Sequence, residues 1–150
     1  MDENKLILTV GLPLSGKTTW ALQQGYPIVN PDGIRWALHG RRFWEPAEKR
    51  VWATAWEMVA ALFHAGHANI IVDATHITKK RRDFWECPGR TYDHPYWPIW
   101  NLRLHVISTP AEVCLERAAQ RGDTEIVPVI ERMAAKAEWP LTCRSGVEEP

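Results

Sequence analysis

The sequence predicts an α/β domain in which a parallel sheet of about four to five strands carries helices on both faces. Short apolar, β-branched segments alternate with longer segments of helical periodicity, a pattern typical of a parallel sheet. The chain has 150 residues, enough for one domain with a core. No repeat or linker divides it, so we expect one domain at 1–139 and a tail at 140–150.

The expected strands are apolar segments bounded by turn residues. They are KLILTV (5–10), YPIVN (26–30), NIIVDAT (69–75) and LRLHVIS (102–108). A run such as KLILTV, with few polar residues, indicates a strand that is buried on both faces.

The expected helices alternate with these strands. They cover 16–24, 31–40, 45–66, 78–86, 110–122 and 127–139. The longest places Trp52, Trp56 and Phe63 on one stripe, and Gly66 ends it. Asp32 is placed to cap the second helix. The segment 87–101, rich in proline and aromatic residues, is expected to be a loop.

Composition narrows the possible classes of protein. Lys and Arg together number 18, as do Asp and Glu, so a nucleic-acid contact must come from a local basic patch. The three cysteines are far apart, which fits neither a disulfide framework nor a zinc site and favours a reducing cytosol. No apolar run reaches membrane-spanning length, and the acidic start is no signal peptide. We therefore expect a cytoplasmic protein with no membrane partner.

The segment GLPLSGKT (11–18) matches the pattern G-x-x-x-x-G-K-[ST] in full. It lies between a buried strand and a helix, which is the context this motif requires. Glycines let backbone N–H groups turn toward an anion, and the helix N-terminus adds its dipole. Lys17 is expected to reach the β- and γ-phosphates of ATP, and the Thr18 hydroxyl to ligate Mg²⁺. The sequence thus predicts a single P-loop NTPase domain.

Two acidic residues follow expected strands. Asp73 ends the strand NIIVDAT, where such folds place metal-side or substrate-side carboxylates, although a helix cap would read the same way. Asp32 and Arg35 are three residues apart and share one face of a helix. Asp32 could take a proton from an attacking hydroxyl, or it could only cap the helix; these residues alone leave both interpretations open.

Arg117 and Arg121 are four residues apart in an expected helix that Gly122 ends. They indicate either a mobile helical lid that brings arginines over phosphates or a solvated amphipathic face. The residues expected to contact ATP are Gly11, Leu12, Pro13, Leu14, Ser15, Gly16, Lys17, Thr18, Thr19, Arg117 and Arg121.

The segment 79–103 interleaves basic and aromatic side chains. The basic residues are Lys79, Lys80, Arg81, Arg82, Arg90 and Arg103, and the aromatic residues are Trp85, Tyr92, Tyr96, Trp97 and Trp100. This combination suits a single-stranded nucleic acid, which such proteins bind by charge and base stacking. Trp85 and Trp100 could instead belong to the core.

Four segments resemble, in order and spacing, the 5′-hydroxyl kinase domain of bacteriophage-type polynucleotide kinases. They are LILTVGLPLSGKTTW, VNPDGIR, IIVDATHITKKRRDFW and ERAAQRGDTEIVPVIERM, and the resemblance covers about residues 5–139. It implies an ATP-dependent kinase that phosphorylates a hydroxyl group of a nucleic acid, with DNA favoured over RNA. The catalytic residues it implies are Lys17, Asp32 as general base and Arg121 on the ATP phosphates.

The resemblance also implies a set of substrate-binding residues on the acceptor side. They are Asp32, Arg35, which would hold the acceptor's phosphate, Asp73, His76 and Arg82. The chain departs from the family pattern at Pro31 and Gly33, where polar residues are usual, and at His76, where a small amide is common.

Other acceptors fit parts of the sequence. A related phage branch phosphorylates the hydroxymethyl group of hydroxymethyluracil in DNA, and the aromatic segment 87–101 would suit holding a base. A kinase of a small metabolite or nucleoside would not need the basic and aromatic stretch. A nucleotide-binding switch would need the P-loop but no acid and arginine pair.

Overall fold

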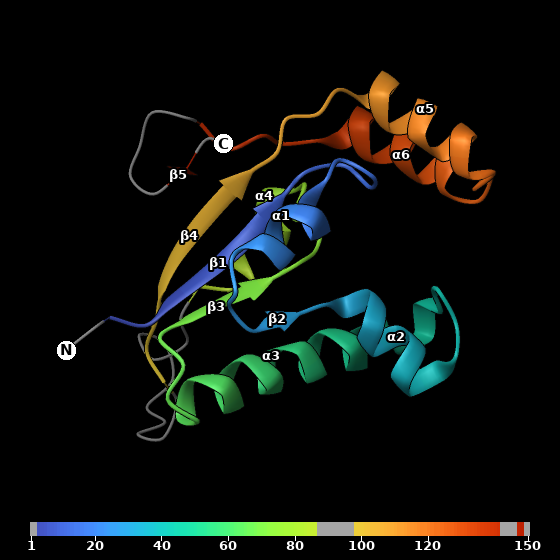
Figure 1. Cartoon of the computed structure of the whole chain (residues 1–150). Helices are drawn as coiled ribbons and strands as arrows, with labels where there is room; N and C mark the ends of the chain where they lie inside the picture. Colours follow the sequence, from blue (N-terminus) through green and yellow to red (C-terminus); the bar gives the residue numbers. More distant parts are fainter. Residues whose placement is uncertain (1–2, 87–97, 142–146, 149–150) are drawn as a thin grey trace.

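The strands of the described chain run parallel in one sheet of order β2-β3-β1-β4-β5 (Figure 1). The computed structural model describes residues 3–86, 98–141 and 147–148. The strands are β1 (Lys5–Val10), β2 (Ile28–Val29), β3 (Asn69–Val72), β4 (Asn101–Val106) and β5 (Val147–Glu148). The helices are α1 (Lys17–Gln23), α2 (Pro31–His39), α3 (Glu48–His64), α4 (Lys79–Asp83), α5 (Ala111–Arg121) and α6 (Ile126–Lys136), with a 3₁₀ helix η1 (Glu45–Ala47) before α3.

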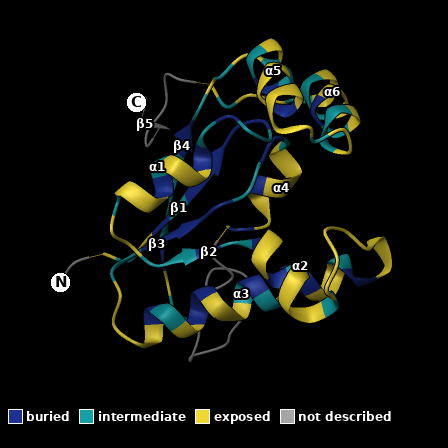
Figure 2. Cartoon of the chain, turned by 45° about the vertical axis from the view of Figure 1, so that its right-hand side comes forward, coloured by how far each residue is buried: buried dark blue, intermediate teal, exposed yellow. Residues whose placement is uncertain are grey.

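Helices cover both faces of the sheet, as predicted. Alternate residues of a strand point to opposite faces, and register partners in neighbouring parallel strands point to the same face. Leu8 of β1 and its partner Val72 of β3 belong to the core that packs on α3, whose buried side faces the sheet (Figure 2). On the other face, Trp20 of α1 stacks on His105 of β4 with ring centroids 3.5 Å apart.

Aromatic side chains fill the core between the sheet and α3. Trp52, Trp85 and Trp100 are buried there, and the indole N–H of Trp100 donates to the carbonyl of Trp85 at 3.0 Å. The alternative that Trp85 and Trp100 are core residues is therefore confirmed. Arg90, Tyr92, Tyr96 and Trp97 lie outside the described residues.

The helices α5 and α6 pack against each other as a pair beside the P-loop (Figure 1). Their shared core includes Cys114, Ala118 and Ile130, together with Leu12 and Ile77, which follow β1 and β3. This second apolar cluster places the predicted lid helices at the carboxyl end of the sheet.

Several strands are shorter than the sequence predicts, and at the end of β3 a side chain replaces part of the backbone ladder. The strand expected at 69–75 ends at Val72. Beyond it, the Thr9 hydroxyl accepts from the Ala74 N–H at 3.2 Å and donates to the Ala74 carbonyl at 2.9 Å. The strands expected at 26–30 and 102–108 are likewise limited to β2 and to 101–106.

Two further features differ from the sequence predictions. The α2 cap is Asn30, whose side-chain oxygen accepts from the N–H groups of Asp32 at 2.8 Å and Gly33 at 3.3 Å. Asp32 itself lies in the first turn, so its assignment as the cap was wrong. In the expected tail, Val147 and Glu148 pair with β4 as a fifth strand.

None of the helices in the described ranges is long and apolar enough to span a membrane.

Candidate active site

A cleft of about 1770 Å³ opens at the carboxyl ends of the strands. Segments that follow β1, β2 and β3 line it, and α3, α4, α5 and α6 complete its walls. In open parallel sheets this edge is where ligands bind, because the loops that leave the strands meet there. The predicted site residues other than Gly11, Leu12 and Arg82 line this cleft.

The P-loop has the backbone that phosphate binding requires. Gly11 has no room for a side chain, since a Cβ there would lie 2.7 Å from Ser15 Oγ and 2.8 Å from the carbonyl oxygen of Ile107. Gly16 has φ 107°, a conformation that only glycine adopts without strain. Gly16 also precedes α1 without any side-chain cap, which leaves the first N–H groups of the helix for an anion.

Lys17 lies at the base of this loop and is almost fully buried. Its Nζ donates to the Leu12 carbonyl at 2.6 Å and lies 3.4 Å from Ser15 Oγ. Burial lowers the pKa of Lys17 to about 8, although the charge of Asp73 opposes this shift. An incoming phosphate group would favour the protonated form and restore the charge.

Thr18 and Asp73 form a pair of oxygen-bearing groups beside the P-loop. The Thr18 hydroxyl donates to Asp73 Oδ2 at 2.6 Å, and the Asn30 amide approaches the same oxygen at 3.5 Å. Asp73 is buried, so it is not a helix cap in solvent. Oxygen ligands of this kind suit a hard divalent cation that takes its remaining ligands from phosphate and water. The residues alone left Asp73 on the metal side or the substrate side, and the family resemblance implied the acceptor side. The structure places its carboxylate on the hydroxyl of Thr18, the predicted metal ligand.

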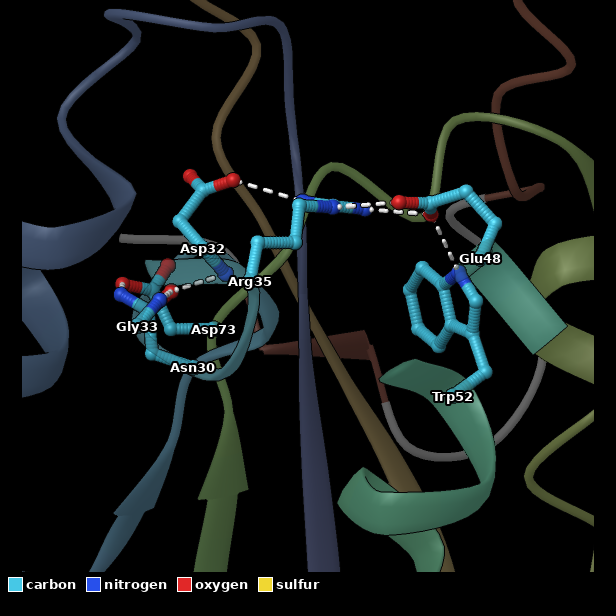
Figure 3. A network of polar contacts seen from close by, with 7 residues as sticks. All are labelled: Asn30, Asp32, Gly33, Arg35, Glu48, Trp52 and Asp73. Carbon is cyan, nitrogen blue, oxygen red and sulfur yellow. Dashed lines mark hydrogen bonds and ion pairs between the residues drawn. The ribbon is translucent and has the colours of Figure 1, made fainter. Parts of the chain in front are cut away.

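Asp32, Arg35 and Glu48 form a charged network along one wall of the cleft (Figure 3). Arg35 Nη1 lies 2.6 Å from Asp32 Oδ1, and its Nε and Nη2 bind the two oxygens of Glu48 at 2.8 and 2.9 Å. The Trp52 indole N–H donates to Glu48 at 3.2 Å. Arg35 is thus fixed from one side by a bidentate carboxylate, while its Asp32 partner has a side chain that is 74% exposed.

Ion pairing outweighs burial in this network. Burial alone would lower the pKa of Arg35 and raise the pKa of Glu48. Their mutual hydrogen bonds and charges reverse both shifts, so the pKa of Arg35 is raised and that of Glu48 is lowered. Both groups are therefore charged at neutral pH. Glu48 could not be recognised as a site residue from the sequence, because an acidic residue in the first turn of a helix is common and gives no sign of a distant partner.

His76 is buried and held in one tautomer by hydrogen bonds at both ring nitrogens. Its Nδ1 lies 2.7 Å from the Thr9 carbonyl and must donate, while Nε2 accepts from the Trp85 indole N–H at 3.0 Å. Burial lowers the pKa of His76 to about 4. The residue was expected to bind substrate; its polar atoms instead join β1 to the Trp85 core.

Arg82 was also expected to bind substrate, but its guanidinium contacts the fold itself. It donates to the carbonyls of His76 at 2.9 Å and Glu138 at 2.6 Å. Arg82 therefore fastens α4 to the segment after α6. Its neighbours Lys80 and Arg81 line the cleft instead.

The lid helices bring arginines to the cleft. Arg117 Nη1 donates to the Leu14 carbonyl in the P-loop at 2.9 Å, and Arg121 lines the cleft one turn further along α5. Arg42, in the segment after α2, binds the two carboxylate oxygens of Asp123 at 3.0 and 2.8 Å. This ion pair joins the α2–α3 side of the cleft to the turn between α5 and α6.

One cleft thus contains three features. They are a phosphate-binding loop, the Thr18–Asp73 pair and the Asp32–Arg35 pair. This combination defines a phosphotransferase of the P-loop kinase class. The chain belongs to the AAA domain family AAA_33, whose model matches residues 6–140.

Solved structures share the fold. A chain of a Pnkp1/Rnl/Hen1 complex is 24% identical with a TM-score of 0.61, over 78% of this chain and 40% of that chain. A second one, titled a Pnkp1/Rnl/Hen1 RNA repair complex, is 20% identical with a TM-score of 0.63, over 92% and 47%. A gluconokinase from Sinorhizobium meliloti 1021 is 18% identical with a TM-score of 0.61, over 99% and 84%. The chain therefore spans less than half the length of the two chains from the Pnkp1 complexes.

Proposed function

We propose that the protein transfers the γ-phosphate of ATP, with Mg²⁺, to the 5′-hydroxyl of a nucleic acid. The observation that carries this proposal is the charge of the cleft. Among the described residues that line it, eleven are Lys or Arg and four are Asp or Glu. The basic residues are Lys17, Arg35, Arg41, Arg42, Lys49, Lys80, Arg81, Arg117, Arg121, Arg132 and Lys136, and the acidic residues are Asp32, Glu48, Asp73 and Glu125.

Part of this charge lies away from the nucleotide-binding loop. Arg41, Lys49, Lys80 and Arg81 come from the segment after α2, from α3 and from α4, and we call them the acceptor-side cations. Within the described ranges, none of the four has a carboxylate at ion-pair distance. The phosphates of ATP occupy the P-loop side, so these cations favour an acceptor with several negative charges of its own.

Each site residue has a part in the proposed transfer. Asp32 accepts the proton of the acceptor hydroxyl while that oxygen forms a bond to the γ-phosphorus and ADP departs. Lys17 and Arg121 stabilise the charge on the phosphates during the transfer. Arg35, held by Glu48, binds the phosphate that follows the acceptor sugar. Thr18 and Asp73 would hold Mg²⁺, which when bound neutralises charge on the ATP phosphates.

Similarity of fold does not distinguish a nucleic-acid acceptor from a small-molecule acceptor. The Pnkp1 complexes, one of them titled an RNA repair complex, and the gluconokinase have similar TM-scores. A sugar acid carries one negative charge, whereas a polynucleotide carries one for each nucleotide. The acceptor-side cations therefore favour the polynucleotide. DNA over RNA, the phage-type branch and the hydroxymethyluracil alternative remain predictions.

The test is transfer of labelled γ-phosphate to a panel of acceptors. The panel holds one oligonucleotide as DNA and as RNA, each with a free or a phosphorylated 5′ end. It also holds an end-blocked DNA with hydroxymethyluracil, a nucleoside and gluconate. We expect label only on the strands with a free 5′-hydroxyl.

The outcomes separate the alternatives. Label on the end-blocked hydroxymethyluracil strand would replace the end kinase with a base kinase. Label on gluconate or the nucleoside alone would exclude a nucleic-acid acceptor. Lys17→Ala is the control for the donor site, because it removes the cation nearest the P-loop and should abolish every transfer.

A further inference from the structure

Two phenylalanines are exposed in the cleft, on elements that also carry the acceptor-side cations. The chain has three phenylalanines; Phe63 is buried in the core, whereas Phe43 is 61% exposed and Phe84 is 39% exposed. Both exposed rings line the cleft on the same side as the acceptor-side cations. Phosphate binding explains the cations but not the rings, since an anion gains nothing from an apolar face.

The backbone around Phe43 is held at the edge of the cleft. Its neighbour Arg42 is ion-paired to Asp123 at 2.8 Å, and this contact fixes the segment to the turn between α5 and α6. The Arg35 guanidinium lies 5.9 Å from the Phe43 ring centroid. Phe43 therefore stands beside the arginine that pairs with Asp32.

Phe84 is supported from behind by the aromatic core. Its ring meets Trp52 at 5.9 Å, Trp56 at 5.5 Å and Trp85 at 5.1 Å, each in an edge-to-face arrangement. The Arg81 guanidinium lies 4.2 Å from the Trp52 ring centroid. Phe84 and Arg81 thus present an apolar ring and a cation next to each other.

Direct contacts connect the two rings along one wall. The Phe43 ring contacts Arg35. Arg35 in turn binds Glu48, which accepts from the Trp52 indole N–H (Figure 3). Trp52 then meets Phe84. Arg35, Glu48 and Trp52 therefore link the two rings, and Arg35 also binds the proposed base Asp32.

We propose that Phe43 and Phe84 are stacking positions for the bases of a single-stranded acceptor near its 5′ end. The acceptor-side cations Arg41, Lys49, Lys80 and Arg81 then bind the intervening phosphates. Alternation of aromatic faces and cations is how proteins hold single strands without reading their sequence. This inference rests on the proposed function and adds that bases, besides phosphates, contribute to acceptor binding.

The test compares two labelled acceptors with identical phosphates. One is a short oligonucleotide with a free 5′-hydroxyl, and the other carries abasic tetrahydrofuran residues at its first positions. Binding is measured by fluorescence anisotropy, and phosphate transfer is measured separately. We expect the protein to bind the strand with bases about 5- to 150-fold more tightly, the range that one stacked base provides.

Phe43→Leu and Phe84→Leu should each reduce this ratio toward one, because leucine keeps apolar bulk but lacks an aromatic face. Phe84→Leu also keeps an apolar side chain against Trp52, Trp56 and Trp85. The matched control is Trp36→Leu, which removes a ring that is 58% exposed on α2 but does not line the cleft. The control should keep the full ratio.

Two failures are distinguishable in this experiment. Equal binding of both strands, or an unchanged ratio in both phenylalanine variants, overturns the stacking inference even when transfer occurs. A ratio that depends on Phe43 and Phe84 without any transfer overturns the proposed kinase activity and leaves the stacking site in place. Absence of both binding and transfer overturns both.

Discussion

Asn30 caps α2 and thereby leaves the Asp32 carboxylate without a structural task at the helix N-terminus. A side-chain oxygen of Asn30 satisfies the N–H groups of Asp32 and Gly33. Pro31 lies at the first helical position, which proline favours, and so fixes the cap at the residue before it. The Asp32 side chain is 74% exposed, and among the described residues it forms an ion pair with Arg35. This placement supports a chemical role over a capping role.

Replacement of Asp32 by Asn should therefore reduce catalysis and leave the helix intact. Asn keeps the size of the side chain and an oxygen for Arg35 but cannot accept the proton of the hydroxyl. We expect kcat to fall about 10²-fold or more, the scale of a lost general base. The affinity for ATP should not change. Steady-state kinetics and ATP titration measure the two effects.

The control is Asp83→Asn, which removes a carboxylate paired with Lys79 on α4, outside the lining of the cleft. It should leave kcat unchanged. If Asp32→Asn behaves like this control, Asp32 is only an acidic residue in the first turn of α2.

The stability of the folded protein depends on pH through His76, because only the neutral ring can make both of its hydrogen bonds. Protonation of Nε2 would set two N–H donors, from His76 and Trp85, against each other in the core. The pKa of His76 is lowered from 6.5 to about 4, so between these values the unfolded chain binds the extra proton and the folded chain does not. The contribution of the neutral His76 ring to the free energy of unfolding is complete above pH 6.5 and is lost as the pH falls toward 4.

His76→Asn should remove that part of the pH dependence. For the parent protein, we expect the free energy of unfolding to fall by up to about 1.4 kcal/mol per pH unit from this one group. Urea unfolding of the parent and the variant at several pH values above 5 measures the difference in slope. His67→Asn, at an exposed histidine, is the control for the substitution itself. Identical slopes for His76→Asn and the parent would contradict a locked neutral ring.

At the scale of elements, hydrophobic periodicity predicts which helices and strands form, whereas polar side chains determine the residue at which an element ends. The stripe on α3 and the apolar run of β1 identify those elements correctly because packing against the sheet requires them. The strand NIIVDAT looks uniform through Thr75, yet it ends at Val72 where Thr9 takes over the hydrogen bonds of Ala74. That contact joins residues far apart in the chain, so no local pattern contains it.

The helix α5 carries one arginine that is fixed to the P-loop and a second that lines the cleft. Arg117 is bound to the P-loop carbonyl of Leu14, whereas Arg121 lies one turn away and lines the cleft. In the proposed transfer, Arg121 acts on the phosphates chiefly when charge develops on them. From the sequence, this face of the helix could have been only a solvated surface. The contact of Arg117 with the P-loop shows that Arg117 is not simply solvated.

Arg121→Ala should consequently lower kcat more than it weakens ATP binding. Arg121→Lys should restore only part of the activity, because lysine lacks the planar, bidentate donor group. Gln120→Ala changes the adjacent exposed residue of α5, which does not line the cleft, and should have no effect. Single-turnover rates and ATP titration of the four proteins make the comparison. Complete rescue by lysine would reduce the role of Arg121 to simple charge attraction.

Across the whole molecule, equal numbers of acidic and basic residues conceal a strong separation of charge. Of the 18 residues of each kind, eleven basic and four acidic residues line the cleft in the described part of the chain. The amino-acid composition predicted that a basic patch had to be local, and the sequence pattern placed that patch in 79–103. The cleft also draws on Arg41, Lys49 and the helices α5 and α6, which come together only in the fold.

This separation makes acceptor binding sensitive to salt in a way that can be assigned to single residues. Each phosphate contact releases a condensed counterion, and for single strands the slope of log affinity against log salt changes by about 0.7 per contact. Lys49 and Arg50 are neighbours on α3, but only Lys49 lines the cleft. We expect Lys49→Gln to flatten the slope for an oligonucleotide by about 0.7 and Arg50→Gln to leave it unchanged. Anisotropy titrations over a range of salt concentrations provide both slopes. Equal slopes for the parent and Lys49→Gln would mean that the acceptor does not run along α3.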